Sequence, residues 1–238
     1  MCFLAFAVCL TFVSVTANGD TLYSDNFDTL SKPTFSIVYG KPEVVGLIGF
    51  FPTSSLALSC SHSLNPISSR KADKFYYDQI EYRIDKPDSP YHGLGRSSFK
   101  VSFDIFAHGL VGSSDQFAVI FDTPSVRNLI FSGDGDVYIA SFRGTSPISK
   151  YSNDDKIHVD IAFDMKNDRW RVLIDGKELF TDVIRGELLT SIRFSHGAKT
   201  ADVIDYTSTT YIDNILIGTE SEGNDRTSKE TISNIETK

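Results

Sequence analysis

Carboxylates that share one face of a strand are the first candidates for chemistry. Glycosidases use two such groups, one as proton donor and the other as nucleophile or base. Successive strand residues point to opposite faces, so Glu81 shares a face with Asp85, and Asp160 shares one with Asp164. Neither pair is accompanied by a third carboxylate at a matching spacing. We interpret both pairs as solvent-exposed acids on strands.

Calcium is the metal ion that the residues of this sequence suit best. The five histidines fall on loops or outward strand positions without metal-ligand spacing, and we predict that they are solvated surface residues: His62, His92, His108, His158 and His196. Calcium takes several oxygen ligands from flexible loops. Asp134 and Asp136 flank a glycine in one turn, and residues 153–155 form an Asn-Asp-Asp cluster. Hairpin turns favour Asp, Asn and Gly for backbone reasons alone, and we prefer that interpretation.

Aromatic side chains could instead bind a sugar. A binding site of this kind combines apolar or aromatic walls with a few well-placed polar groups. Phe106 stands out because it lies on the polar face of an otherwise regular strand. Tyr82 and Tyr138 are further candidates whose rings, like that of Phe106, are expected to be exposed, and Glu81 and Arg83 flank Tyr82 as polar partners. The sequence predicts that these five residues form a ligand site.

The strands that must position these groups are clearest between Lys156 and Phe180. Apolar residues alternate with polar ones on both sides of a polar loop at 165–168, and Asp175-Gly176 is a hairpin signal. Pairing the strands across the loop places three pairs side by side: Phe163 with Trp170, Ile161 with Val172, and Val159 with Ile174. This parity predicts that Trp170 belongs to the core, under a second sheet.

The remaining chain repeats the pattern. About eleven to thirteen strands are predicted, and no segment has helical periodicity over three turns. Further strands are expected at Thr34–Val45, Phe75–Ile84, Ser98–Leu110, Phe117–Phe121, Asn128–Phe131, Val137–Phe142, Leu188–Phe194 and Thr209–Ile217. Val44–Pro66 is rich in Gly, Ser and Pro and is predicted to be a long surface excursion, with one short strand signal at Leu56–Cys60. The pattern indicates an all-β sandwich or closed barrel.

Composition and the chain ends suggest a compartment. Met1–Ala17 is apolar, uncharged and ends in small residues, which predicts a secretory signal peptide, with a short membrane anchor as the alternative. No other stretch is long and apolar enough to span a membrane. The net charge of −8 argues against nucleic acid or an anionic membrane as partner. We expect one domain over residues 18–218 and a disordered polar tail over 219–238.

Four segments resemble one family when they are taken together. Tyr23–Phe27, Asp160–Asp164, Trp170–Ile174 with its Asp175-Gly176 turn, and Tyr211–Ile217 are similar to strands of concanavalin A-like jelly rolls, which include laminin-G-like domains. The resemblance covers roughly residues 20–218. It implies two antiparallel sheets of six or seven strands, one convex and one concave. Members bind sugars, cleave polysaccharides or mediate protein contacts, so membership does not choose a function.

The enzymes of this family carry motifs that the chain lacks. Glucanases have a Glu-x-Asp-x-x-Glu strand, and alginate lyases pair Gln-Ile-His with Tyr-Phe-Lys. Here the corresponding run is Gln79-Ile80-Glu81, and no Tyr-Phe-Lys run occurs. We therefore expect a secreted, non-catalytic module that binds carbohydrate or matrix. The alternatives are a polysaccharide lyase or glycoside hydrolase with an unrecognised site, and an adhesion or structural domain with an extracellular protein as partner.

Overall fold

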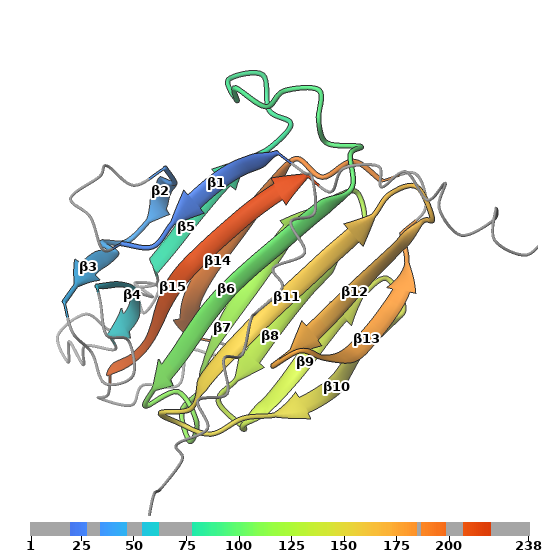
Figure 1. The fold of residues 1–238 in the computed structure, drawn as a ribbon. Coiled ribbons are helices and arrows are strands. Elements are labelled where there is room, and N and C mark those ends of the chain that lie inside the picture. The colour runs from blue at the N-terminus through green and yellow to red at the C-terminus, as the bar shows by residue number, and fades with distance from the viewer. Residues whose placement is uncertain are drawn as a thin grey trace, which may run out of the picture.

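The computed structural model describes residues 20–27, 34–46, 54–61, 78–184, 187–198 and 207–219. These ranges contain fifteen strands and no helix, arranged in two antiparallel sheets (Figure 1). The all-β, two-sheet jelly-roll sandwich predicted from the sequence is therefore confirmed. The predicted signal peptide and all of the predicted tail beyond Thr219 lie outside the described residues.

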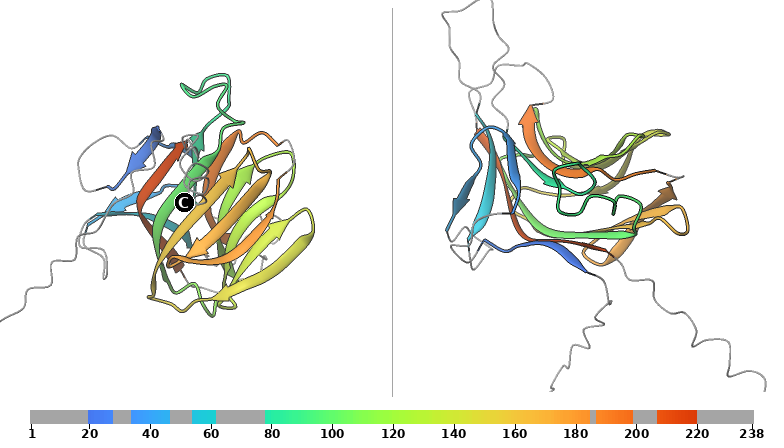
Figure 2. Two further views of the ribbon diagram at one scale, coloured as in Figure 1. Left: turned by 45° about the vertical axis from the view of Figure 1, so that its right-hand side comes forward. Right: turned by 90° about the horizontal axis from the view of Figure 1, so that it is seen from above.

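We call the sheet nearer the viewer in Figure 1 the front sheet and the other the back sheet. The front sheet has the order β13 (Lys177–Val183), β12 (Arg169–Ile174), β11 (Lys156–Asp164), β6 (Phe99–His108), β15 (Thr207–Thr219), β4 (Ser55–Ser61) and β3 (Glu43–Val45), and β1 (Thr21–Asp25) also pairs with β15. The back sheet has the order β10 (Gly144–Lys150), β9 (Asp136–Ser141), β8 (Arg127–Ser132), β7 (Asp115–Asp122), β14 (Ser191–Ala198), β5 (Asp78–Arg83) and β2 (Ser36–Tyr39). Seen from above, the front sheet curves so that its β3 and β4 end turns towards the back sheet (Figure 2).

The register predicted for β11 and β12 is confirmed at all three pairs: Phe163 with Trp170, Ile161 with Val172, and Val159 with Ile174. The turn that follows has Asp175 at φ 50° and Gly176 at φ 76°. Two successive positive φ values match the right-handed twist of a tight hairpin, which explains the Asp-Gly pair.

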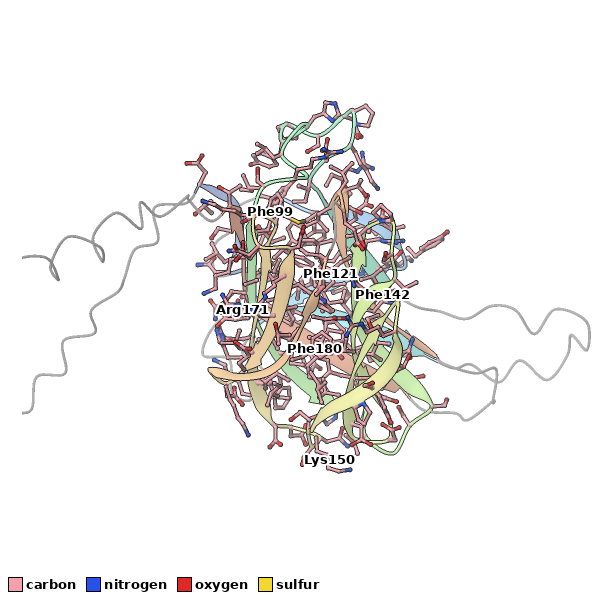
Figure 3. All side chains as sticks on the ribbon, turned by 90° about the vertical axis from the view of Figure 1, so that its right-hand side faces the viewer. Phe99, Phe121, Phe142, Lys150, Arg171 and Phe180 are labelled. Atoms are coloured by element: carbon pink, nitrogen blue, oxygen red, sulfur yellow. The ribbon has the colours of Figure 1, made fainter. Side chains whose placement is uncertain are left out.

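The core lies between the two sheets and is rich in rings. Trp170 is fully buried, and its ring stacks on Phe163 at 5.8 Å between centroids. Phe121 of the back sheet meets it edge-on at 6.2 Å, and Phe180 of β13 does so at 5.1 Å (Figure 3). The prediction that Trp170 is a core residue is confirmed.

One prediction in the first third of the chain is wrong, and one is confirmed. The single strand expected at Thr34–Val45 is two strands, β2 and β3, which lie in different sheets. Gly40, at φ 77°, lies between them in a backbone region that glycine adopts easily. Within the expected excursion at Val44–Pro66, the short strand predicted at Leu56–Cys60 is confirmed as β4, which pairs with β15 and buries Leu56 and Leu58 completely. β10 was not predicted, because its Gly-Thr-Ser-Pro start has no strand signal.

Candidate functional site

The predicted ligand residue Tyr82 is a core residue. Its ring is fully buried, and its hydroxyl donates a hydrogen bond to Asp25 Oδ2 at 2.8 Å. Burial, together with the Asp25 carboxylate, raises the pKa of Tyr82. The prediction that this residue is exposed is wrong. β5 points Ile80 and Tyr82 inwards on the same face, a parity that is visible in the sequence.

Phe106 has the predicted parity but not the predicted exposure. It pairs with Lys156 and Tyr211 in the front sheet, and the rings of Phe106 and Tyr211 lie 6.0 Å apart. Only 5% of Phe106 is accessible, so the prediction of an exposed ring is wrong. A ring with so little free surface offers a sugar no face on which to stack.

Glu81 is buried, so the prediction that it is a solvent-exposed acid is wrong, and it forms a paired cluster with Arg83 on β5. Glu81 accepts a hydrogen bond from Lys86 Nζ at 2.5 Å and another from Arg83 Nε at 3.1 Å. Burial acts to raise the pKa of Glu81, but the hydrogen bonds from Lys86, Ser191 and Arg83 outweigh it and leave the pKa lowered. Arg83 also pairs with Asp88. A carboxyl group that is ionised and paired in this way is unsuited to donate a proton as a glycosidase acid.

Tyr138, Asp134 and Asp136 form a second group on the back sheet. The Tyr138 hydroxyl donates to Asp134 Oδ2 at 2.9 Å, which raises the pKa of Tyr138 to about 12. Lys150 Nζ lies 2.9 Å from Asp136 Oδ1. β9 is separated from β5 by three strands, so Tyr138 is roughly 19 Å from Glu81 at the usual strand spacing. The five predicted ligand residues therefore do not converge on one site.

The described residues contain no group of three or more His, Cys, Asp or Glu side chains that could hold a metal ion. Asp134 and Asp136 engage the Tyr138 hydroxyl and the Lys150 ammonium group instead. Calcium binding at this turn stays a prediction.

A polar cluster that sequence reasoning missed lies on the front sheet where β6 and β11 run side by side. His158 Nδ1 is 2.6 Å from Asp104 Oδ1, and its Nε2 is 3.4 Å from both Ser102 Oγ and Asp160 Oδ2. Asn214 donates to Asp104 Oδ2 at 2.9 Å. The signal for this cluster is the cross-strand register, which pairs His158 with Asp104 and Asp160 with Ser102.

The order of Ser102, His158 and Asp104 is that of a nucleophilic triad, but three features oppose that role. The Nε2 atom is shared between the serine and Asp160. Ser102 is buried. The strand β6 also pairs on both sides, with β11 and β15, so its backbone N–H groups serve the sheet rather than an oxyanion hole. We interpret the cluster as an ion-pair network that stabilises the sheet.

Histidine 196 corrects the prediction that all five histidines are surface residues. It is fully buried, with Nδ1 2.9 Å from Thr210 Oγ1 and Nε2 2.8 Å from Ser208 Oγ. Both ring nitrogens therefore have hydroxyl partners inside the sandwich, as buried polar groups require.

A cavity of about 430 Å³ opens at the edge where β10 and β13 approach each other, and we call it the edge cavity. It is lined by Ser125, Arg127, Phe142, Arg143, Val183 and Glu187. Figure 3 faces this edge and shows Phe142 at its surface. Phe142 is 58% exposed, so part of its ring is free to contact a ligand. Such a ring beside a cavity with charged walls is the arrangement expected of a ligand site.

Arg127 is a buried charged residue in the wall of the edge cavity. Its side chain is 1% exposed and holds Glu187 through two hydrogen bonds, Nη2 to Oε1 at 2.6 Å and Nε to Oε2 at 3.2 Å. Nη2 also donates to the Val183 carbonyl at 3.2 Å. Its Nη1 has no hydrogen-bond partner among the described residues. A buried guanidinium with a free donor is costly unless an acceptor reaches it.

Arg127 also belongs to a stack of alternating rings and cations. Its Cζ lies 5.7 Å from the centroid of the Trp170 ring and also 5.7 Å from the centroid of the Phe142 ring. Arg143 Cζ lies 5.3 Å from the same Phe142 ring. All three separations are within the range of cation–π attraction. The stack links the buried core at Trp170 to the exposed rim of the edge cavity.

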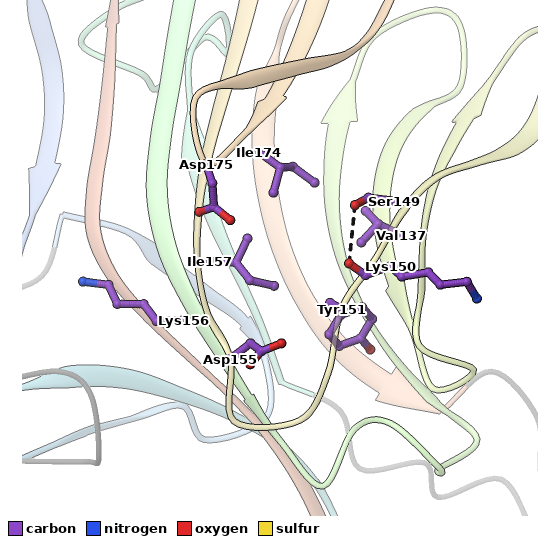
Figure 4. Close-up of a pocket in the computed structure, with 9 residues that line it drawn as sticks. All are labelled: Val137, Ser149, Lys150, Tyr151, Asp155, Lys156, Ile157, Ile174 and Asp175. Carbon is purple, nitrogen blue, oxygen red and sulfur yellow. Dashed lines mark hydrogen bonds between the residues drawn. The ribbon is translucent and has the colours of Figure 1, made fainter.

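A second cavity of about 210 Å³ lies between the sheets at the ends of β10, β11 and β12 (Figure 4). Asp155, Asp175 and Tyr151 line it together with Lys150 and Lys156, whose side chains point away from each other. The Tyr151 ring is buried, its hydroxyl donates to the Ser132 carbonyl at 2.7 Å, and burial raises its pKa. This cavity has no exposed aromatic ring, so it offers less to a sugar than the edge cavity.

Comparison with known proteins places the fold but not a family. No family model matches the sequence, and no curated protein does. Among the described residues, no helix is long and apolar enough to cross a membrane.

Several solved structures share this architecture, and the names of some of them refer to carbohydrates. A sialidase matches with TM-score 0.55 and 17% identity over 79% of this chain and 17% of its own. The binding domain of botulinum neurotoxin DC in complex with rat synaptotagmin II matches with TM-score 0.53 and 14% identity, over 83% of this chain and 47% of its own. A carbohydrate esterase from the Shiga toxin-encoding bacteriophage phi24B matches with TM-score 0.57 and 11% identity, over 85% of this chain and all of its own. The chain thus spans less than half of the first two proteins, and these likenesses show a shared two-sheet β-sandwich.

Proposed function

We propose that this protein is a secreted, non-catalytic carbohydrate-binding module of the concanavalin A-like, laminin-G-like kind, and that it binds a saccharide at the edge cavity. The observation that carries the proposal is the exposed Phe142 ring at the rim of this cavity, flanked by the guanidinium groups of Arg127 and Arg143. An apolar ring face and fixed donors are the two features that a pyranose requires.

The size and the polarity of the edge cavity suit a sugar. Ligand pockets commonly enclose roughly 300–1,000 Å³, and about 430 Å³ falls in this range. Arg127 and Arg143 supply donors, and Ser125 supplies a hydroxyl, for the hydroxyl groups of a sugar. Val183 adds apolar surface.

The absence of catalysis in this proposal rests on how the candidate acids of the described residues are used. Glu81 is paired with Lys86 and Arg83, and Glu187 with Arg127. Asp160 lies 3.1 Å from Lys100 Nζ and 3.4 Å from His158 Nε2. A retaining or inverting glycosidase needs one carboxyl group that is free to donate a proton to the glycosidic oxygen, and each of these three carboxylates is held by a cationic partner instead.

A glycan array tests the proposal, with calcium in one arm and a chelator in the other. We expect binding to one glycan class and loss of that binding in Phe142→Ala. Tyr39→Ala is the matched control, because Tyr39 is 53% exposed and lies on β2, at the opposite edge of the back sheet. No binding across the array in either arm, or equal losses in the two variants, would reject the edge cavity as a saccharide site. Loss only under chelator would add the calcium site proposed at Asp134 and Asp136.

Protein adhesion is the second candidate, and a different surface favours it. Ile37, Tyr39 and Val44 are about half exposed or more on the short strands β2 and β3. Exposed apolar side chains on edge strands are a common basis for protein contacts. Binding to an array of extracellular matrix proteins that Tyr39→Ala abolishes, and Phe142→Ala leaves intact, would support this function instead.

A further inference from the structure

The edge cavity has charged side chains of both signs in and beside its walls. Two arginines and one glutamate line it, so its walls carry a net positive charge, whereas the whole chain has a net charge of −8. Asp182 holds the Arg143 guanidinium with Nη1 at 3.4 Å from its Oδ1, but Asp182 does not line the cavity. With Asp182 counted, the two arginines are balanced by two carboxylates, so the argument for an anionic ligand depends on the hydrogen-bond donors of Arg127 and Arg143.

The geometry of Arg127 specifies the kind of negative group. One edge of its guanidinium, formed by Nε and Nη2, is occupied by the Glu187 carboxylate. The remaining terminal nitrogen, Nη1, has no acceptor among the described residues. Glu187 already fills the side-on fork, so Nη1 is the donor that is left for a ligand, and a charged acceptor forms a stronger hydrogen bond with it than a hydroxyl does.

Arg143 provides a second donor that can adapt. Its side chain is 64% exposed, so its contact with Asp182 is weak and open to solvent. Phe142 lies in contact with both guanidinium groups, at 5.7 Å from Arg127 Cζ and 5.3 Å from Arg143 Cζ. An anionic group at the rim would therefore meet guanidinium donors close to the Phe142 ring.

We infer that the edge cavity selects saccharides that carry a carboxylate, and that Arg127 Nη1 and Arg143 donate hydrogen bonds to this carboxylate. This inference rests on the proposed saccharide function and narrows its ligand class. Neutral sugars of the same shape would leave the Arg127 donor unsatisfied or paired with a weaker acceptor.

Calorimetric titration of the purified protein tests the inference with two sources of carboxylate. One is a hexuronic acid trisaccharide, compared with its methyl ester, and the other is sialyllactose, compared with lactose. We expect at least one of the two acids to bind about tenfold or more tighter than its neutral counterpart, the usual gain from a charged acceptor. The screening of charges by salt should weaken the acid and not the ester.

Variants assign the effect to the two arginines. Arg143→Gln changes an exposed side chain and should bring the affinity for the acid down to that for the neutral sugar. Arg127→Lys keeps the charge beside Glu187 but loses the fork, and should have the same effect. Arg171→Gln is the control, since Arg171 is exposed on the front sheet, where Figure 3 shows it away from Phe142. If Arg127→Lys does not fold, as judged by its fluorescence, Arg143→Gln alone decides the outcome.

The outcomes separate the two proposals. Equal affinity for acid and neutral forms, or an acid preference that survives Arg143→Gln, would overturn the inference and leave the saccharide function standing. No binding to either acid, to either neutral form or to the glycan array would overturn both.

Discussion

The Arg127–Glu187 pair offers the sharpest test of how the edge cavity is built. Both side chains are buried, at 1% and 8% exposure, and they join the start of β8 to the segment after β13. Glu187→Gln keeps the shape of the side chain but removes the charge that neutralises Arg127. Breaking a buried ion pair from one side costs about 3–5 kcal/mol, because the remaining charge is left without compensation.

This cost is large compared with the total stability of a domain, which is typically about 5–15 kcal/mol. For a domain of this size, each kcal/mol shifts Tm by roughly 2–4 °C, so Tm should fall by roughly 6–20 °C. Urea unfolding followed by tryptophan fluorescence measures the change directly. Trp170 is the only tryptophan, and its ring lies 5.7 Å from Arg127 Cζ, so the signal also reports on the site itself.

A double variant and an exposed control complete the experiment. In Arg127→Met with Glu187→Leu, no buried charge remains, so most of the lost stability should return. Glu178→Gln removes an exposed partner of Arg171, at 3.7 Å, and should cost no more than about 1 kcal/mol. The reasoning fails if Glu187→Gln costs less than about 1 kcal/mol, or if the double variant is as unstable as the sum of its single changes.

The remaining predictions concern other parts of the sandwich. Burial acts to raise the pKa of Asp104, but hydrogen bonds from His158, Asn214 and Lys156 leave the pKa lowered, so the contribution of Asp104 to stability is present above the ordinary carboxyl pKa of about 3.9 and is lost as pH falls below it. Between pH 6 and pH 2, the free energy of unfolding of Asp104→Asn should therefore decline less steeply than that of the wild type. Parallel curves for the two proteins would contradict this. The hydrogen bond to Asp134 raises the pKa of Tyr138 to about 12. The difference between the absorbance titration curves of the wild type and Tyr138→Phe reports on Tyr138, and this difference should move to lower pH when both proteins also carry Asp134→Asn. An unchanged difference curve would refute the assigned cause. Trp170→Ala should cost about 3–5 kcal/mol by leaving a cavity under the front sheet, measured by urea unfolding followed by circular dichroism, and a loss below about 1 kcal/mol would contradict its core role. If Asp134 and Asp136 bind calcium, millimolar calcium should raise Tm and Asp136→Asn should abolish the increase; equal Tm values with calcium and with chelator would end that prediction.

Much of the fold could be predicted because alternation is a local property. In β11 and β12, the polar loop and the Asp-Gly turn fix where each strand begins, and the apolar face fixes the register, so the pairing of Phe163 with Trp170 follows. The same parity would have placed Tyr82 in the core beside Ile80. The prediction that Tyr82 binds a ligand relied on its aromatic ring and did not take its strand parity into account.

The candidate site could not be predicted, because its members are far apart in the chain. Arg127 and Glu187 are separated by 60 residues, and Phe142 lies on a turn between them. Alternation gives no reason to single out any of the three. Phe142 follows a serine at the end of a strand, where a lone exposed aromatic residue is ordinary.

By itself, the sequence determined which face of each strong strand is apolar, where the tight turns fall, and hence a two-layer β-structure. These properties follow from the chain's own period and from residues that tolerate positive φ. The tertiary structure alone decided which strands become neighbours, how β3 and β4 join the front sheet, and which edges close. The edge cavity exists only because the start of β8, the turn between β9 and β10, and the end of β13 come together there, and a long-range arrangement of this kind depends on the packing of the whole sandwich rather than on any local pattern.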